Sequence, residues 1–219
     1  MALGSFAGGG GSGGEFAARI EYNAKAGRFF RVDRENIGGE YQTDKVEITD
    51  GFAAIFDLAN IEVGWAHYPP QSAPSMVFGP PDAPPPRPNE DHKAAIRVRM
   101  KLSPTTAGGK EAIREFVTSA IVARGALDVL HDAYLAAPEA AQGKLPVVGL
   151  RGAPAPVSGK HGTNYEPRFV ITGWKDRPDD LKAPQAKPAA KPAAAASGPP
   201  ATGSTQARQP EPEPAGADW

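Results

Sequence analysis

The stretch Lys93–Leu102, which reads KAAIRVRMKL, constrains the fold more than any other part of the chain. In an extended backbone, successive side chains point to opposite faces of a sheet. One face would then carry Ile96, Val98, Met100 and Leu102, and the other would carry Arg97, Arg99 and Lys101. The pattern predicts a central strand with an apolar face on the core and a cationic face that meets an anionic partner.

Composition divides the chain into three parts. Residues 1–14 are rich in glycine, which predicts a flexible leader. Residues 183–219 are rich in alanine and proline and have almost no large apolar side chain, so they predict a disordered tail. Residues 15–182 are expected to form one domain.

Further strands are expected on both sides of the central one. The extended segments are 16–22, 28–32, 45–49, 52–58, 61–65, 145–150 and 168–174. Apolar residues spaced by three or four between Lys110 and Ala136 predict one long helix, which ends before Pro138. The fold class is therefore expected to be mainly β with one long helix (α+β).

The strand order predicts an OB-fold-like five-stranded barrel. Its helix would lie between strands three and four, and such barrels bind oligonucleotides across strands two and three. The segment Lys93–Leu102 would be the third strand. The proline-dense segment 69–88 predicts a long loop inside the domain, either a binding flap or a passive excursion.

Basic and aromatic residues supply candidates for contact with a single strand of nucleic acid. Cations would neutralise phosphates and aromatic rings would stack on bases, with little base preference. Phe29 is either such a platform, with Arg28 or Arg31 beside it, or part of the core. The phosphate-binding candidates are Arg97, Arg99, Lys101, Arg28, Arg31 and Lys175, and the stacking candidates are Phe29, Trp65 and Trp174.

The tail ends in QPEPEPAGADW. Its acids Glu211, Glu213 and Asp218 would steer a partner protein electrostatically, and Trp219 would supply an aromatic anchor. The alternative is a solvated tail whose last residue happens to be aromatic. The first interpretation predicts a partner-binding motif at residues 209–219.

These features together resemble the single-stranded DNA-binding proteins of bacteria and bacteriophages. The shared features are an OB-like strand order, basic and aromatic residues on the expected binding face, a Pro/Ala-rich linker and an acidic tip with a terminal aromatic residue. The resemblance implies non-catalytic binding of single-stranded DNA in replication, recombination and repair. It also implies that the tip recruits replication and recombination proteins, and that the protein acts in the cytoplasm of a bacterial or phage-infected cell.

Several enzyme classes find no support in the sequence. The chain has no cysteine, and its four histidines lack the spacing of a metal site. Gly108-Gly109-Lys110 is not a phosphate-binding loop, because Glu111 stands where Ser or Thr is required. No GxSxG motif occurs. The expectation is a protein without catalytic residues, metal or other cofactor.

Charge and hydropathy leave other questions open. The formal net charge is −1, and neither a signal peptide nor a membrane-spanning run is expected. One alternative function is a protein-interaction or phage structural module, in which the cations of Lys93–Leu102 make surface ion pairs. Another is a metal-dependent nucleic-acid enzyme that uses Asp33, Asp57 and Asp91. The preference for DNA over RNA, the size of the binding site and a homo-oligomeric state are not decided by the sequence.

Overall fold

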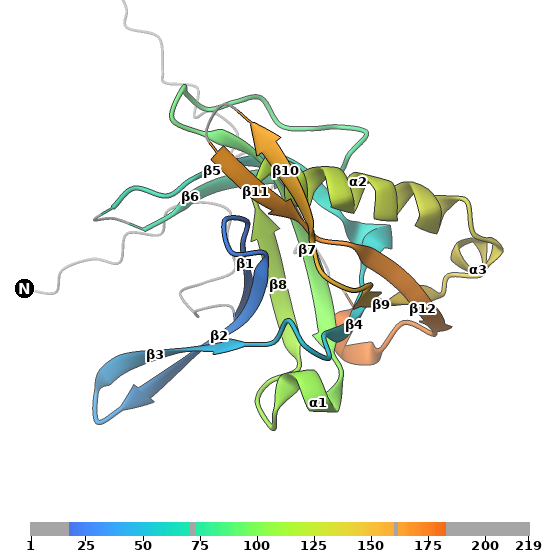
Figure 1. The fold of residues 1–219 in the computed structure, drawn as a ribbon, viewed down its shortest axis with the longest axis horizontal. Helices are drawn as coiled ribbons and strands as arrows, with labels where there is room; N and C mark the ends of the chain where they lie inside the picture. Colours follow the sequence, from blue (N-terminus) through green and yellow to red (C-terminus); the bar gives the residue numbers. More distant parts are fainter. Residues whose placement is uncertain (1–17, 71–72, 160–161, 183–219) are drawn as a thin grey trace, which may run out of the picture. The chain divides into compact units, whose positions relative to one another are not determined.

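The computed structural model describes residues 18–70, 73–159 and 162–182 (Figure 1). The predicted leader and tail, and with them Glu211, Glu213, Asp218 and Trp219, lie outside the described residues. Strands dominate the described part of the chain, and ten of them form one sheet.

Strand β7, Lys93–Leu102, is the strand around which this sheet is built. Its apolar residues are 0–5 % exposed, whereas the cations between them are half-buried on the other face. Strand β8, Ile113–Thr118, runs antiparallel along one edge of β7. The other edge is shared, because β5 (Glu62–His67) pairs with the first half of β7 and β4 (Ala53–Phe56) with the second. The predicted central strand is confirmed.

The main path of the sheet runs from β12 through β9, β4, β7, β8, β1 and β2 to β3. Strand β1 is parallel to β8, with Ile20 opposite Phe116, and the other neighbouring pairs are antiparallel. The bounds not yet given are β1 (Arg19–Asn23), β2 (Arg28–Ile37), β3 (Glu40–Glu47), β9 (Leu145–Leu150) and β12 (Phe169–Lys175). Strand β6 (Ser75–Gly79) pairs with β5, and β10 (Ala155–Gly159) forms a separate hairpin with β11 (Gly162–Glu166).

The prediction of an OB-fold-like five-stranded barrel with its helix between strands three and four is wrong. The described strands form a mixed sheet that ends at β12 and β3 and does not close into a barrel. The main cause is β8, which directly follows β7 in the sheet where the helix was expected. Strand β6 also lies inside the proline-dense segment, because Ser75–Gly79 contains no proline and can pair along β5.

The predicted long helix is shorter and begins later. Helix α2 spans Ile121–Leu135, and the residues before it form β8. The inward residues of β8 are Arg114, Phe116 and Thr118, all buried. Two of these three are polar, so the alternation of a half-buried strand is absent from the sequence. The remaining apolar residues are spaced by three and four, and this spacing is typical of a helix, so the sequence predicts one there.

Short helical segments complete the chain. Helix α1, Pro104–Ala107, begins where the Ser103 hydroxyl accepts a hydrogen bond from the Thr106 amide and ends at Gly108, whose φ is +57°. The other segments are α3 (Pro138–Ala141), η1 (Leu58–Asn60) and η2 (Asp179–Leu181).

The core lies between the inner face of the sheet and the apolar side of α2. Helix α2 contributes Leu127, Leu130 and Tyr134, which are spaced by three and four as an amphipathic helix requires. The sheet contributes buried apolar residues from β1, β2, β4, β7, β8 and β9. This packing fixes the start of α2 close to the ends of β7 and β8 at which the candidate site lies.

Candidate nucleic-acid interface

The predicted phosphate-binding cations of β7 are held by neighbouring acids in two of three cases. The guanidinium of Arg97 donates from Nε and Nη2 to the Glu62 carboxylate at 2.6 and 2.9 Å and lies 4.6 Å from the centroid of the Phe78 ring. Desolvation lowers the pKa of Arg97, but the hydrogen bonds and charge of Glu62, with the charge of Glu115, outweigh it and raise that pKa. Arg97 therefore already has a bidentate partner.

The remaining two cations of β7 differ from each other. The ammonium of Lys101 lies 2.5 Å from a carboxylate oxygen of Asp180. Nη1 of Arg99 is buried and has no hydrogen-bond partner among the described residues. Among the described residues, Arg99 is thus the cation of this face that has no acidic partner.

The candidate platform Phe29 lies in the core. It is 1 % exposed, and its ring centroid is 4.5 Å from that of Tyr22 and 5.0 Å from that of Phe52. A base cannot stack on a ring that is covered on all sides by protein. Its neighbour Phe30 is half-buried, with the Lys45 ammonium 4.4 Å from the ring centroid.

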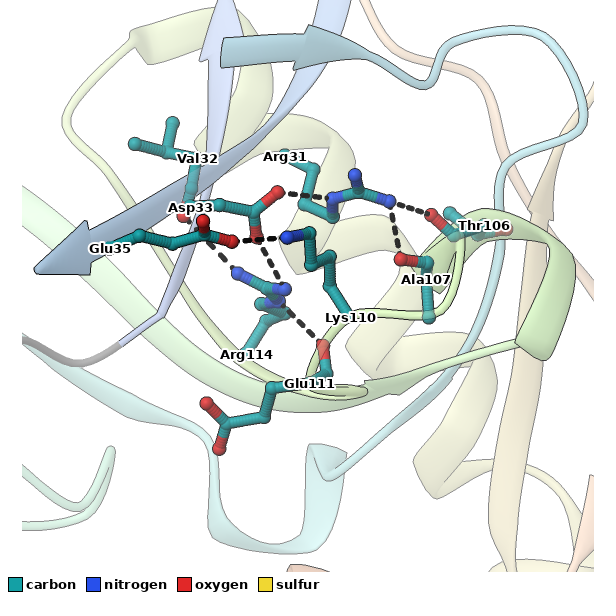
Figure 2. Close-up of polar contacts among 9 residues, drawn as sticks. All are labelled: Arg31, Val32, Asp33, Glu35, Thr106, Ala107, Lys110, Glu111 and Arg114. Carbon is teal, nitrogen blue, oxygen red and sulfur yellow. Dashed lines mark hydrogen bonds and ion pairs between the residues drawn. The ribbon is translucent and has the colours of Figure 1, made fainter. Parts of the chain in front are cut away.

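Arg31 belongs to a buried ionic cluster (Figure 2). Asp33 sits between two guanidinium groups, with Oδ2 2.8 Å from Nε of Arg31 and Oδ1 2.7 Å from Nη2 of Arg114. All three side chains are buried. Two cations and one anion leave a surplus positive charge at this end of the core, so the remaining donors need oxygen partners.

Backbone carbonyls supply those partners. Nη1 of Arg31 donates to the carbonyls of Thr106 and Ala107 at the end of α1. Arg114 donates from Nη1 to the carbonyl of Val32 and from Nε to that of Glu111, at 3.2 and 3.0 Å. The cluster therefore joins β2, α1 and β8, and Arg31 is not available to a phosphate.

The other predicted cations and rings are scattered over the surface. Arg28 pairs with Glu47 at 2.5 Å, and both side chains are exposed. Lys175 is exposed at the end of β12. The half-buried Trp174 packs against Tyr134, with ring centroids 6.0 Å apart. The structure does not bring these three residues to the cations of β7.

Trp65 lines a cavity of about 640 Å³ at the start of α2, named here the α2 cavity. Strand β5 places Trp65 opposite Ala94 of β7. Its indole Nε1 donates to the carbonyl of Pro85 at 3.0 Å, and the guanidinium of Arg87 lies 5.3 Å from its ring centroid. The α2 cavity is lined by residues of β5, of the loop between β6 and β7, of β7, of the link between β8 and α2, and of α2 itself. These residues are Trp65, Arg87, His92, Lys93, Ala94, Ser119, Ala120, Ile121 and Arg124.

Positive charge in the α2 cavity has no acidic counterpart among the lining residues. Lys93 is exposed and makes no ion pair with another described residue. Nε of Arg124 is buried without a hydrogen-bond partner among the described residues. The first turn of α2 adds partial positive charge, because the first backbone amides of a helix have no partner within it. Ala120 at the N-cap has no side chain that could accept a hydrogen bond from them. These groups together make the cavity cationic.

Arg87 is held in place by the loop that carries it. Its Nε donates to the carbonyl of His92 at 2.9 Å, and its Nη2 donates to that of Glu90 at 2.5 Å. Both ring nitrogens of His92 also have partners, Asn89 and Ser75. Arg87 and His92 therefore form a fixed wall, whereas Lys93 and Arg124 contribute positive charge that no acidic lining residue compensates.

A second cavity of about 570 Å³, named here the Tyr68 cavity, adjoins the first. Ser119 and Ala120 line both cavities. Tyr68, Met76 and Val117 give the Tyr68 cavity apolar walls, and Arg19, Glu21 and Glu115 give it charges. Partial burial raises the pKa of Tyr68, with Arg19 lowering it and Glu21 raising it, so the phenol stays protonated at neutral pH.

No protein-family model, curated protein or solved structure matches this chain.

The acids of the predicted alternative enzyme are apart in the fold. Asp33 bridges Arg31 and Arg114, and Asp57 accepts a hydrogen bond from Arg177. Among the residues that the structure describes, no group of three or more His, Asp or Glu could hold a metal ion. None of the described helices has the length and apolar character needed to cross a membrane.

The cations of the α2 cavity were not singled out from the sequence. Arg87 lies in the proline-dense segment, Lys93 begins the central strand and Arg124 lies on α2. Each alone looks like an ordinary surface residue, and only the fold brings them together. The one useful signal was the aromatic pair Trp65 and Tyr68 just before the prolines, because each lines one of the two cavities.

Proposed function

We propose that this protein binds single-stranded DNA without cleaving it, and that the strand passes through the α2 cavity. The supporting observation is a cavity that is lined by Trp65, Lys93 and Arg124 and by no acidic residue. Lys93 makes no ion pair with another described residue, and Nε of Arg124 has no hydrogen-bond partner among them. Stacking on Trp65 would hold a base, and the cations would hold phosphates. The acidic tip with Trp219 is still predicted to recruit partner proteins.

The double variant K93A/R124A in the full chain tests this proposal. Titration with oligo-dT, followed by tryptophan fluorescence, should show an affinity about tenfold weaker than that of the wild type at low salt. The slope of log affinity against log salt should become less steep by about 1.4, since each single-strand phosphate contact contributes about 0.7.

The matched control is R28A/K175A, which removes the same charge away from the α2 cavity. It should keep most of the affinity and the salt slope. Equal losses in the two double variants would place binding outside the α2 cavity. Absence of saturable quenching in the wild type would exclude the function itself.

A protein-interaction module is the second candidate function. It is favoured by the ion pairs of Arg97 with Glu62 and Lys101 with Asp180, which compensate cations predicted for DNA. Exposed apolar side chains at Met76, Val77 and Ile121 would suit contact with a protein. The same titration separates the two, because such a module would give no response to oligo-dT.

A further inference from the structure

The Tyr68 cavity contains a carboxylate, that of Glu115, whose charge acts on Arg97 but which has no hydrogen-bond or ion-pair partner among the described residues. Glu115 is half-buried on β8, in register with Arg99 of β7. No hydrogen bond or ion pair joins its carboxylate to another residue of the described segments 18–70, 73–159 and 162–182. Glu21, the other carboxylate of this cavity, is paired with Lys45 at 2.7 Å. Glu115 is therefore the acceptor still open to a ligand.

The walls around Glu115 suit a flat ring. Tyr68 is 49 % exposed, and Met76 and Val117 offer further apolar surface in the same cavity. Aromatic side chains provide stacking surfaces for bases, and the polar groups beside them read the base edges. Because Ser119 and Ala120 line both cavities, a strand whose phosphate lies in the α2 cavity can place an adjacent base against Tyr68.

A carboxylate distinguishes bases by their hydrogen-bonding edges. Cytosine presents an amino group at N4 that donates to a carboxylate, whereas thymine presents the O4 acceptor at the equivalent place. Two acceptors facing each other repel and leave the half-buried carboxylate unsatisfied.

We infer that the Tyr68 cavity is a base-binding site in which Glu115 favours bases that carry an amino group, so that cytosine binds more tightly than thymine. This inference rests on the proposed function, since it assigns the base contact of the same strand. It replaces the expectation of little base preference with a specific one.

The experiment compares oligo-dC with oligo-dT of equal length, at a pH where cytosine carries no proton, in the full chain. Wild-type protein should bind oligo-dC at least about fivefold more tightly, the lower end of the range for one specific base contact. In E115Q the ratio should fall to about one, because the Gln amide both donates and accepts hydrogen bonds. The control E111Q changes an exposed acid outside the Tyr68 cavity and should keep the wild-type ratio.

Three results would overturn the inference. They are equal binding of the two oligonucleotides by the wild type, tighter binding of oligo-dT, and a preference for oligo-dC that survives in E115Q. In each of these cases saturable binding would leave the proposed function standing. Failure of both oligonucleotides to bind would instead remove the proposed function together with the base preference.

Discussion

Two basic clusters of this protein have similar side chains and opposite environments. In the buried cluster, Asp33 lies between Arg31 and Arg114, and backbone carbonyls take the remaining donors (Figure 2). In the α2 cavity, Lys93 and Arg124 line the wall, and neither the ammonium of Lys93 nor the buried Nε of Arg124 has a partner among the described residues. A cation thus stabilises the fold where a carboxylate and carbonyls meet it, and is available to a ligand where they do not.

Among the variants that test this comparison, D33A should have the largest effect, which is a loss of folding stability. It leaves two buried guanidinium groups without their shared carboxylate, and breaking a buried ion pair costs about 3–5 kcal/mol in the free energy of unfolding. Urea denaturation of the purified protein measures this loss. D33N, which keeps one acceptor oxygen, should lose less and covers the case in which D33A does not fold.

The control for D33A is E35A, two residues along the same strand. Glu35 pairs with Lys110 near the buried cluster, but both side chains are exposed (Figure 2). E35A should leave the urea midpoint unchanged within error. If D33A were as stable as E35A, the buried cluster would not hold β2, α1 and β8 together.

Alkaline pH separates the arginines from another buried polar group. Arginine side chains stay charged at alkaline pH. Any loss of folding stability between pH 10 and pH 12 must therefore come from other residues, and Tyr22 is one of them. Burial and the charge of Glu166 raise the pKa of Tyr22 to about 12. Because this folded pKa lies above the ordinary value of 10, the contribution is full below pH 10 and is lost as the pH rises through about 12.

Each pKa unit is worth about 1.4 kcal/mol, so this contribution amounts to about 2–3 kcal/mol. Urea titrations at a series of alkaline pH values measure it, with Y22F as the comparison. Y22F should lose less stability over this pH range than the wild type. Parallel losses in the two proteins would show that the Tyr22 hydroxyl does not contribute in this way.

The triple variant R97A/R99A/K101A tests whether the outer face of β7 shares the role of the α2 cavity. Since Glu62 and Asp180 already hold two of these cations, a phosphate would have to replace a carboxylate partner, and we expect a loss of oligo-dT affinity of less than about threefold. The K93A/R124A variant, measured beside it, should lose more. The reverse order would identify the outer face of β7 as the main phosphate track.

The smallest expected effect concerns the pair of Lys101 and Asp180. Both side chains are partly exposed, and such surface pairs contribute about 0–1 kcal/mol. A double-mutant cycle of K101A and D180A by thermal denaturation measures this coupling. A coupling energy well above that range would mean that this ion pair stabilises the contact between η2 and β7 more than an exposed ion pair does.

The sequence predicted strands best where one face is uniformly apolar. The bounds of β7 and β9 agree with the predicted segments 93–102 and 145–150. Strand β8 was missed because its inward face carries Arg114, whose burial depends on Asp33 from another strand. The hairpin of β10 and β11 was missed because its residues are mostly exposed and polar, without the alternation that predicts a strand.

The candidate site could be predicted only in part. Alternation in β7 correctly placed Arg97 and Lys101 on the outer face, but the acids that pair with them come from β5 and η2. Trp65 was singled out, whereas Arg124 was not, because nothing in the sequence brings the start of α2 to β5. Contacts between segments far apart in the chain decide which charges are neutralised, and a local pattern does not contain them.

The parallel pairing of β1 with β8 has a consequence for the order in which the chain can fold. Arg19 and Ile20 find their partners Glu115 and Phe116 only when most of the domain has left the ribosome. Until then β1 and β2 form an antiparallel pair with one open edge. Closing so long a loop is entropically unfavourable and slows folding. Assembly of the sheet is therefore expected to finish late in synthesis. The arrival of β8 joins β1, β2 and β3 to β7, and β9 and β12, which follow in the chain, then extend the other end of the sheet.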